Sequence, residues 1–123
     1  MRVPENELGS VVKNAIVKML ELAGRESYKG DIVLDVRDGL DGELRGGLAE
    51  DALYNIVRAV YWWMTGDDGL IKVRTEVDGE RRASTSYNLA GDREIDEVVR
   101  GFFRNYGEYI RQRARCRESQ GLA

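Results

Sequence analysis

The segment from Leu48 to Leu89 constrains the fold of this chain more than any other. Its first part, residues 48–64, has apolar residues at helical spacing along one side and predicts an amphipathic helix. The sequence TGDDG then ends this helix. Residues 70–77 and 80–89 alternate in polarity, which predicts two strands. A helix followed by a short turn and a charged two-stranded ribbon is therefore the central unit of the predicted fold.

The helix predicted over 48–64 has an apolar side and a polar side. The apolar side should face the core and consists of Leu48, Ala52, Leu53, Ile56, Val57, Val60, Trp63 and Met64. The opposite side carries Glu50, Asp51, Asn55, Arg58 and Trp62, with Tyr54 and Tyr61 at the edges. Consecutive helical residues point about 100° apart. Trp62 should therefore be exposed if Trp63 is buried.

The two predicted strands read as a hairpin. Asp78-Gly79 lies between them and is typical of a two-residue type I′ turn, because both central residues of that turn need a positive φ. Alternation places Ile71, Val73, Thr75 and Val77 on one side of the first strand, and Ala83, Thr85, Tyr87 and Leu89 on one side of the second.

The chain before Leu48 predicts a helix, an ambiguous segment and a loop. The helix covers 8–23 and ends near Gly24, with an apolar stripe of Leu8, Val12, Ala15, Ile16, Met19, Leu20 and Ala23. Residues 28–40 fit either a helix or a short strand. Their β-branched residues favour the strand, but the neighbouring helices favour a helix, and we prefer the helix while keeping the strand open. Residues 38–47 contain four glycines and predict a loop.

The last predicted helix covers about 93–116. Asp92 can cap it, and the arginines at 111–117 suit the negative end of its dipole. Its apolar residues recur at heptad-like spacing, which is typical of a helix that pairs with another. These residues are Ile95, Val99, Phe102, Tyr106 and Tyr109, with Val98, Phe103 and Ile110 widening the stripe. Gly101 and Gly107 weaken the helix but could let another helix approach closely.

Composition limits the class of protein. The 123 residues suit one domain, and the 33% of charged residues exceed the average of about 25%, as is often seen in proteins from hot environments. The single Cys excludes an internal disulfide. No apolar run approaches the roughly 20 residues that span a bilayer, and the N-terminus lacks the apolar region of a signal peptide. We expect a soluble, cytoplasmic protein without a membrane partner.

The charged residues argue against catalysis and complicate nucleic-acid binding. The chain has no His, which removes the usual general base and the commonest metal ligand, so we expect no enzyme, no cofactor and no metal site. The net charge of −3 does not favour a nucleic-acid partner. The charges are polarised, however. Residues 30–51 are strongly acidic, whereas residues 109–117 carry four arginines and no acid.

The order of these features resembles the winged helix-turn-helix superfamily and is similar to PadR-like transcriptional regulators. The residues that support the resemblance are Tyr28, Ile32, Leu40, Leu53-Tyr54, Val57, Gly69-Leu70-Ile71, Gly79 and Tyr87-Asn88-Leu89, followed by a long helix. The chain departs from the pattern in its longer TGDDG turn and in the acidic start of the presumed recognition helix. The resemblance covers about residues 8–115.

The resemblance implies an α+β fold: three helices and a β-hairpin wing, with a long C-terminal dimerisation helix. We expect a flexible arm at 1–7, a winged-helix domain at 8–90, the dimerisation helix at 91–117 and a disordered tail at 118–123. The expected function is a sequence-specific, double-stranded-DNA-binding regulator, most simply a repressor, that acts as a homodimer. The dimer interface would comprise Ile95, Val99, Phe102, Phe103, Tyr106, Tyr109 and Ile110.

DNA contacts are expected from the polar helix side and from the ribbon. A protein that reads DNA in this way presents one helix to the major groove and a cationic ribbon to the flanking backbone. The candidate DNA-binding residues are Tyr54, Asn55, Arg58, Lys72, Arg74, Arg81, Arg82 and Ser84. Asn55 could read adenine, and Arg58 could read guanine or contact a phosphate.

A protein-interaction module is the competing hypothesis. In this reading, the acidic 30–51 surface and an exposed Trp62 meet a basic or apolar partner, and DNA is irrelevant. An exposed Trp62 is explained more simply by contact with another subunit than by a site for a small apolar effector, although the effector site is the more specific hypothesis.

Asp31, Asp35 and Asp38 could share a helical face, but a solvated acidic surface is far commoner than a metal site. Cys116 lies among arginines and is most simply an incidental thiol.

Overall fold

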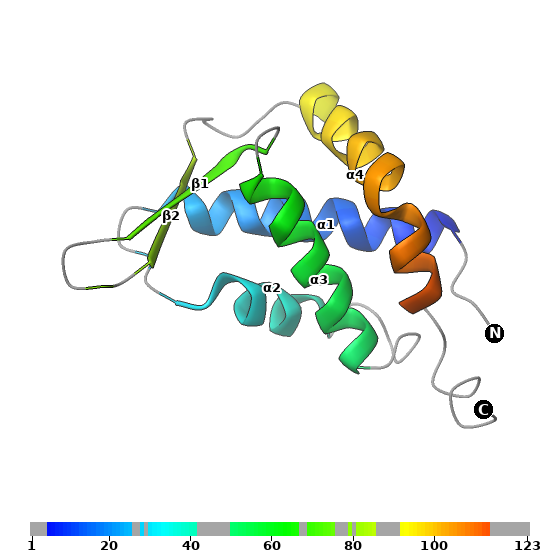
Figure 1. Cartoon of the computed structure of the whole chain (residues 1–123), viewed down its shortest axis with the longest axis horizontal. Helices are drawn as coiled ribbons and strands as arrows, with labels where there is room; N and C mark the ends of the chain where they lie inside the picture. Colours follow the sequence, from blue (N-terminus) through cyan, green and yellow to red (C-terminus); the bar gives the residue numbers. More distant parts are fainter. Residues whose placement is uncertain are drawn as a thin grey trace.

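The computed structural model describes residues 5–25, 28, 30–41, 50–66, 69–75, 79, 81–85 and 92–113. These residues form a mostly helical chain with two short strands (Figure 1). The elements are α1 (Glu5–Ala23), α2 (Ile32–Asp41), α3 (Glu50–Thr65), β1 (Ile71–Thr75), β2 (Arg81–Thr85) and α4 (Asp92–Arg113). The predicted order of elements is confirmed. However, α1 begins at Glu5, inside the arm expected at 1–7.

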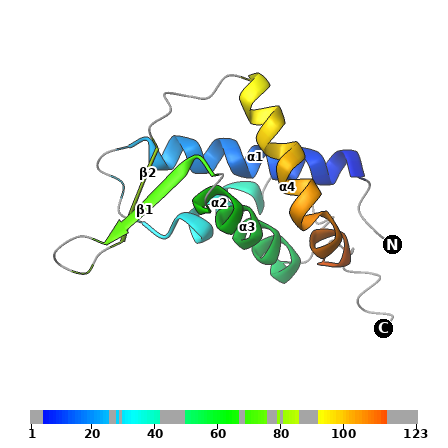
Figure 2. The ribbon, with the colours of Figure 1, turned by 45° about the horizontal axis from the view of Figure 1, so that its top comes forward.

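Helix α3 lies at the centre of the packing and contacts α1, α2 and α4. Its predicted apolar side is buried: the exposed fraction is at most 3% for Ala52, Leu53, Ile56, Val57, Val60 and Met64. The stripe predicted for α1 is buried as well. Figures 1 and 2 show strands β1 and β2 beside one end of α1. Helix α4 crosses α1 closer to the other end. No helix among the described residues is long and apolar enough to cross a membrane.

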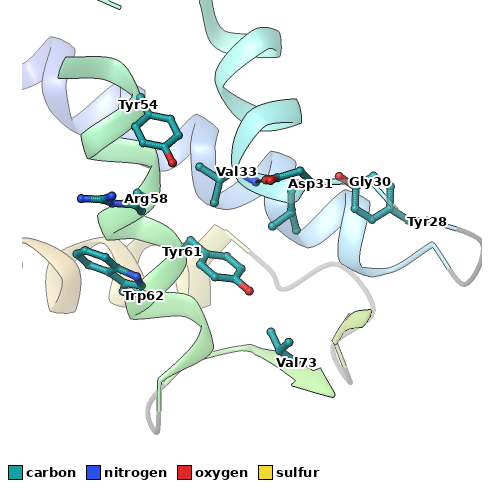
Figure 3. A pocket seen from close by; sticks show the side chains of 10 residues that line it. Tyr28, Gly30, Asp31, Val33, Tyr54, Arg58, Tyr61, Trp62 and Val73 are labelled. Carbon is teal, nitrogen blue, oxygen red and sulfur yellow. Dashed lines mark hydrogen bonds between the residues drawn. The ribbon is translucent and has the colours of Figure 1, made fainter. Parts of the chain in front are cut away.

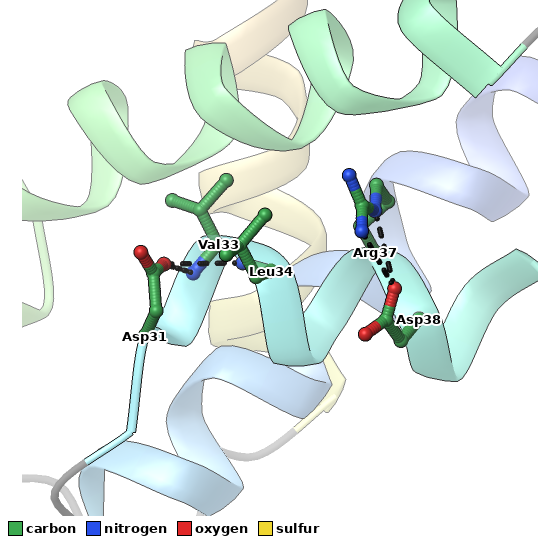
Figure 4. A network of polar contacts seen from close by, with 5 residues as sticks. All are labelled: Asp31, Val33, Leu34, Arg37 and Asp38. Carbon is green, nitrogen blue, oxygen red and sulfur yellow. Dashed lines mark hydrogen bonds and ion pairs between the residues drawn. The ribbon is translucent and has the colours of Figure 1, made fainter.

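The ambiguous segment forms helix α2, so the strand alternative is wrong. Asp31 caps the helix, because its Oδ1 accepts hydrogen bonds from the backbone N–H groups of Val33 and Leu34 at 3.1 and 3.2 Å (Figure 4). Helix α2 continues to Asp41, which shortens the loop predicted over 38–47. Leu40 is 1% exposed. Burying its side chain outweighs the cost of about 1 kcal/mol that Gly39 imposes on the helix.

The two strands pair as an antiparallel ribbon, one residue out of the predicted register. Thr75 pairs with Arg81 and Ile71 with Thr85. A two-residue turn at Asp78-Gly79 would instead pair Thr75 with Arg82, so that turn is wrong. The register leaves an odd number of residues between the strands, and Gly79 has a φ of 87°. A left-handed glycine of this kind is typical of three-residue hairpin loops. Residues 76–78 and 80, and the predicted strand ends beyond Thr85, lie outside the described residues.

The turn between α3 and β1 depends on Gly69. Its backbone N–H donates to the Gly66 carbonyl at 3.0 Å. A Cβ atom on Gly69 would lie 1.9 Å from the Met64 carbonyl oxygen, so no larger residue fits without a backbone shift. This tight turn brings β1 directly against α3, where Ile71 is buried.

Helix α4 packs against α1 and α3 of its own chain. Ile95, Phe102 and Ile110 are buried in the core, which removes three of the seven predicted dimer contacts from the surface. The other four, Val99, Phe103, Tyr106 and Tyr109, are half-buried against the same core. The heptad-like spacing therefore serves packing within the chain first. Residues 114–117 of the predicted helix, the predicted tail and Cys116 lie outside the described residues.

Trp63 fixes α4 onto α3. Its indole N–H donates to the Val98 carbonyl at 3.2 Å, and its ring meets Tyr106 edge-to-face at 6.3 Å between centroids. A Cβ atom on Gly101 would lie 2.7 Å from the Trp63 ring, so Gly101 permits this contact. The prediction that a glycine of this helix allows close approach holds at Gly101. Trp63 itself is half-buried, less deeply than expected for a core residue.

We predict opposite effects for two Gly→Ala substitutions in helices. Gly101→Ala should lower the free energy of unfolding by about 1–3 kcal/mol, because the added methyl group collides with a ring that cannot move away. Gly9→Ala is the control, since a Cβ atom at Gly9 meets nothing within 4 Å. It should raise the free energy of unfolding by up to about 1 kcal/mol through helix propensity. Urea denaturation measures both, and equal stability of the two variants would contradict this packing.

Candidate functional site

The outward side of α3 is the most distinctive surface of the molecule. Burial of the apolar stripe turns Tyr54, Asn55, Arg58 and Trp62 away from the core, because residues four apart lie on one side of a helix. Trp62 is 46% exposed, as its position next to Trp63 predicts. Helix α2 and strand β1 flank this side of α3.

Cations and aromatic rings alternate along this surface. The Arg58 guanidinium lies over the Trp62 ring at 4.8 Å and over the Tyr54 ring at 5.6 Å from the centroids. Arg37 approaches Tyr54 from α2 at 5.9 Å and also pairs with Asp38 at 2.9 Å (Figure 4). Each cation–π contact stabilises by about 0.5–2 kcal/mol, so these side chains hold one another in place. The Arg58 side chain is therefore held in one position by the two rings.

One polar atom of Arg58 has no hydrogen-bond partner among the described residues. Its Nε is buried and makes no hydrogen bond within the described part of the chain. An unsatisfied buried N–H group costs about 1–3 kcal/mol, and native structures contain few of them. The surrounding rings exclude water from the atom without replacing its hydrogen bond.

A cavity of about 480 Å³ opens beside Arg58, within the size range of small-molecule sites (Figure 3). It is bounded by α3, by the segment that leads into α2 and by β1. Tyr54 and Tyr61 point from α3 toward the α2 side, and Val73 points toward the same space from β1. The lining residues are Tyr28, Gly30, Asp31, Ile32, Val33, Tyr54, Arg58, Tyr61, Trp62 and Val73.

The far wall of the cavity is held by Tyr28. Its hydroxyl donates a hydrogen bond to Asp35 one turn into α2. Partial burial, and then the Asp35 carboxylate, raise the pKa of Tyr28 well above its usual value of 10. A Cβ atom on Gly30 would lie 2.5 Å from the Asp35 Oδ2 and 2.9 Å from the Tyr28 hydroxyl, so a larger residue would have to displace this hydrogen-bonded pair.

The exposed apolar side chains gather on the same face. Among the described residues, the large exposed ones are Leu34, Trp62 and Val73, at 38%, 46% and 36%. Trp62 and Val73 line the cavity. Leu34 lines an adjoining groove together with Arg37, Asp51 and Tyr54, so Tyr54 belongs to both depressions. Apolar surface concentrated at concave sites is typical of binding surfaces.

The structure brings together only part of the predicted DNA-binding set. Tyr54 and Arg58 meet at the cavity, together with Trp62, and Asn55 is half-buried beside them. Lys72 is exposed on β1. The remaining residues are placed by the strand register: Lys72 pairs with Ser84, Arg74 with Arg82, and Thr75 with Arg81.

Sequence reasoning missed the α2 side of the site. Tyr28 was used only for the winged-helix resemblance, Asp31 was considered only with Asp35 and Asp38 as a shared acidic face, and Gly30 was given no role. Tyr28 lies before the start of α2, so no helical spacing links it to Asp35 in the sequence. The three aspartates of α2 act separately: Asp31 caps the helix, Asp35 accepts from Tyr28 and Asp38 pairs with Arg37. No group of acids placed to hold a metal occurs in the described ranges.

Comparison of the chain with known protein families, with characterised proteins and with solved structures finds no match.

We predict that Tyr28 makes the stability of the protein sensitive to alkaline pH. The folded chain holds the hydroxyl proton more tightly than the unfolded chain, because the pKa is raised on folding. This stabilisation is complete below about pH 10, the unfolded pKa, and is lost as the pH rises toward the raised folded value. Tyr28→Phe should therefore lose stability less steeply above pH 10 than the wild type does.

Denaturation of both proteins between pH 8 and pH 11.5 measures the two slopes. Below pH 10 the variant should be less stable by about 1 kcal/mol, since it lacks the hydrogen bond to Asp35. Parallel curves for the two proteins above pH 10 would contradict the assignment.

Proposed function

We propose that this chain is a winged-helix, sequence-specific DNA-binding regulator that acts as a homodimer. One observation is the main support: the outward side of α3, with Tyr54, Arg58 and Trp62, lies next to a paired ribbon whose β1 strand lines the same cavity. A helix with one free side, braced by a second helix and followed by a cationic ribbon, is the arrangement that winged-helix proteins use on DNA.

In the proposed complex, α3 enters the major groove. A helix fits this groove, which is about 12 Å wide, and side chains on its outward side then reach base edges. Asn55 and Arg58 are the proposed base-reading residues, with Tyr54 contacting a phosphate. The stacking of Arg58 on two rings limits the entropy lost when it binds, because its side chain is already positioned.

The ribbon supplies the phosphate contacts. Its register pairs Lys72 with Ser84 and Arg74 with Arg82, so these four positions fall on the same face of the pleat. Arg81 pairs with Thr75 and falls on the other face, together with Ile71 and Val73. Of the predicted ribbon contacts, Arg81 is therefore the least suited to share a phosphate with the others.

The acidic residues of the α2 region determine from which side DNA can approach the protein. Asp31, Asp35 and Asp38 are exposed along this helix and would repel a DNA backbone that came close to them. The backbone is expected to approach from the ribbon side, where Lys72 is exposed. This arrangement reconciles DNA binding with the net charge of −3, at the expense of non-specific affinity.

The proposed homodimer relies on α4. Four of its residues keep part of their surface accessible after packing within the chain, and they recur every three or four positions along the helix: Val99, Phe103, Tyr106 and Tyr109. A second copy that covers these residues would place two α3 helices for a palindromic site.

We predict that the two ribbon arginines determine how DNA affinity depends on salt. Arg74→Ala combined with Arg82→Ala should weaken binding to every duplex and reduce the slope of log affinity against log salt by up to about 2, since each phosphate contact contributes about 0.9. Arg100→Ala with Arg104→Ala is the matched control, because both arginines are exposed on α4 and the change in charge is identical.

Fluorescence anisotropy of a labelled duplex at two salt concentrations measures these slopes. Equal slopes for the two double variants would remove the ribbon from the interface. Asn55→Ala should differ from both, weakening binding at particular base positions by about 1–3 kcal/mol.

A protein partner is the second candidate function, favoured by Leu34, Trp62 and Val73. Leu34 lines the groove, and Trp62 and Val73 line the adjoining cavity, both beside carboxylates of the α2 region, which suits a partner segment with apolar and basic residues. The anisotropy experiment separates the two functions. A folded, dimeric protein that ignores duplex DNA at low salt would favour the protein partner.

A further inference from the structure

We propose that the cavity between α2, α3 and β1 is a nucleobase site, which accepts a base extruded from the bound nucleic acid. This inference rests on the proposed function, because the base is supplied by the DNA that α3 contacts. The new claim is that the cavity itself binds a ligand, and that this ligand is a nucleobase.

The walls of the cavity favour a flat ring. Tyr54, Tyr61 and Trp62 contribute aromatic surface from α3, and Tyr28 contributes it from the opposite wall (Figure 3). Bases stack on such side chains whatever their sequence, since every base has a π face. Trp62 is available for stacking because 46% of it is exposed.

The polar atoms of the cavity match the edge of a base. Arg58 lines the cavity, and its terminal guanidinium N–H groups can donate to a base carbonyl or ring nitrogen. The tyrosine hydroxyls of the lining can donate or accept. Asp31 uses one carboxylate oxygen to cap α2, which leaves the other to accept an N–H of the base. A flipped base is recognised by this combination of stacking and hydrogen bonds to its edge.

The charges around the cavity favour a base over a phosphate. Arg58 and Asp31 both line the cavity, and Asp35 and Asp38 follow Asp31 along α2, so carboxylates outnumber the cations Arg58 and Arg37 and disfavour a polyanion. A base is uncharged, and the same carboxylates can accept its hydrogen bonds. The phosphates of the same strand are then free to lie on the ribbon side, near Lys72.

A bulged duplex tests the proposal. The protein is titrated into two labelled duplexes of the same sequence, one perfectly paired and one with a single unpaired base, and the affinities are compared by anisotropy. An unpaired base costs little to extrude. The wild type should bind the bulged duplex about tenfold more tightly, the gain expected from stacking one base.

Substitutions at Trp62 test whether the preference for the bulged duplex depends on the cavity. Trp62→Ala should abolish the preference for the bulge, whereas Trp62→Phe should retain most of it. Leu34→Ala is the matched control, because Leu34 is an exposed apolar residue of the same face that does not line the cavity. It should leave the preference unchanged.

Free nucleosides distinguish the source of the base. Millimolar nucleoside should quench tryptophan fluorescence in the wild type but not in Trp62→Phe, which retains only Trp63. Quenching without a preference for the bulged duplex would mean that the cavity takes a free nucleoside.

The negative outcomes separate the two proposals. Equal binding of both duplexes without nucleoside quenching would overturn the base site and leave DNA binding intact. No binding of either duplex at low salt would overturn DNA binding, and with it a base delivered by DNA.

Discussion

Burial of one side of α3 is the constraint on which the rest of the structure depends. Leu53, Ile56, Val57, Val60 and Met64 are at most 1% exposed, and each fully buried side chain of this size contributes about 1.5–3 kcal/mol. Helices α1, α2 and α4 assemble around this side. Because a helix cannot turn one side inward without turning the other outward, the same burial presents Tyr54, Arg58 and Trp62 to solvent.

The outward side then forms a preorganised surface. Arg58 stacks on Trp62 and Tyr54, Tyr28 is held by Asp35, and the tight turn at Gly69 keeps β1 against α3. These contacts are local, yet together they shape the cavity, and the buried Arg58 Nε beside it has no hydrogen-bond partner within the described ranges.

Much of the fold could be predicted because its signals are periodic. The stripes of α1 and α3 are long, and a long stripe identifies both a helix and its buried side. Short segments were harder to predict from the sequence. Helix α2 was ambiguous because β-branched residues fit both structures, and its C-terminal end was placed too early because Gly39 resembles a loop residue while Leu40 is buried by tertiary contacts.

Features set by contacts between distant segments could not be predicted. The ribbon register differs by one residue from the two-residue turn that Asp78-Gly79 indicated, although Gly79 does have a positive φ. The stripe of α4 was assigned to a dimer, but Phe102 packs within the chain. Arg58 was predicted to contact DNA, but the cavity beside it was not foreseen, because its lining includes Tyr28 from another segment.

The most direct test of the account is an NMR titration of the ¹⁵N-labelled protein with duplex DNA at low salt. The chain has two tryptophans, and their indole N–H signals report on different surfaces. Trp62 lies exposed on the outward side of α3, whereas the Trp63 indole donates to Val98 inside the helix packing. The account predicts that the Trp62 indole and the amides of Asn55, Arg58 and Lys72 shift while the Trp63 indole does not. Shifts confined to α1 and α4, or no shifts at all, would contradict it.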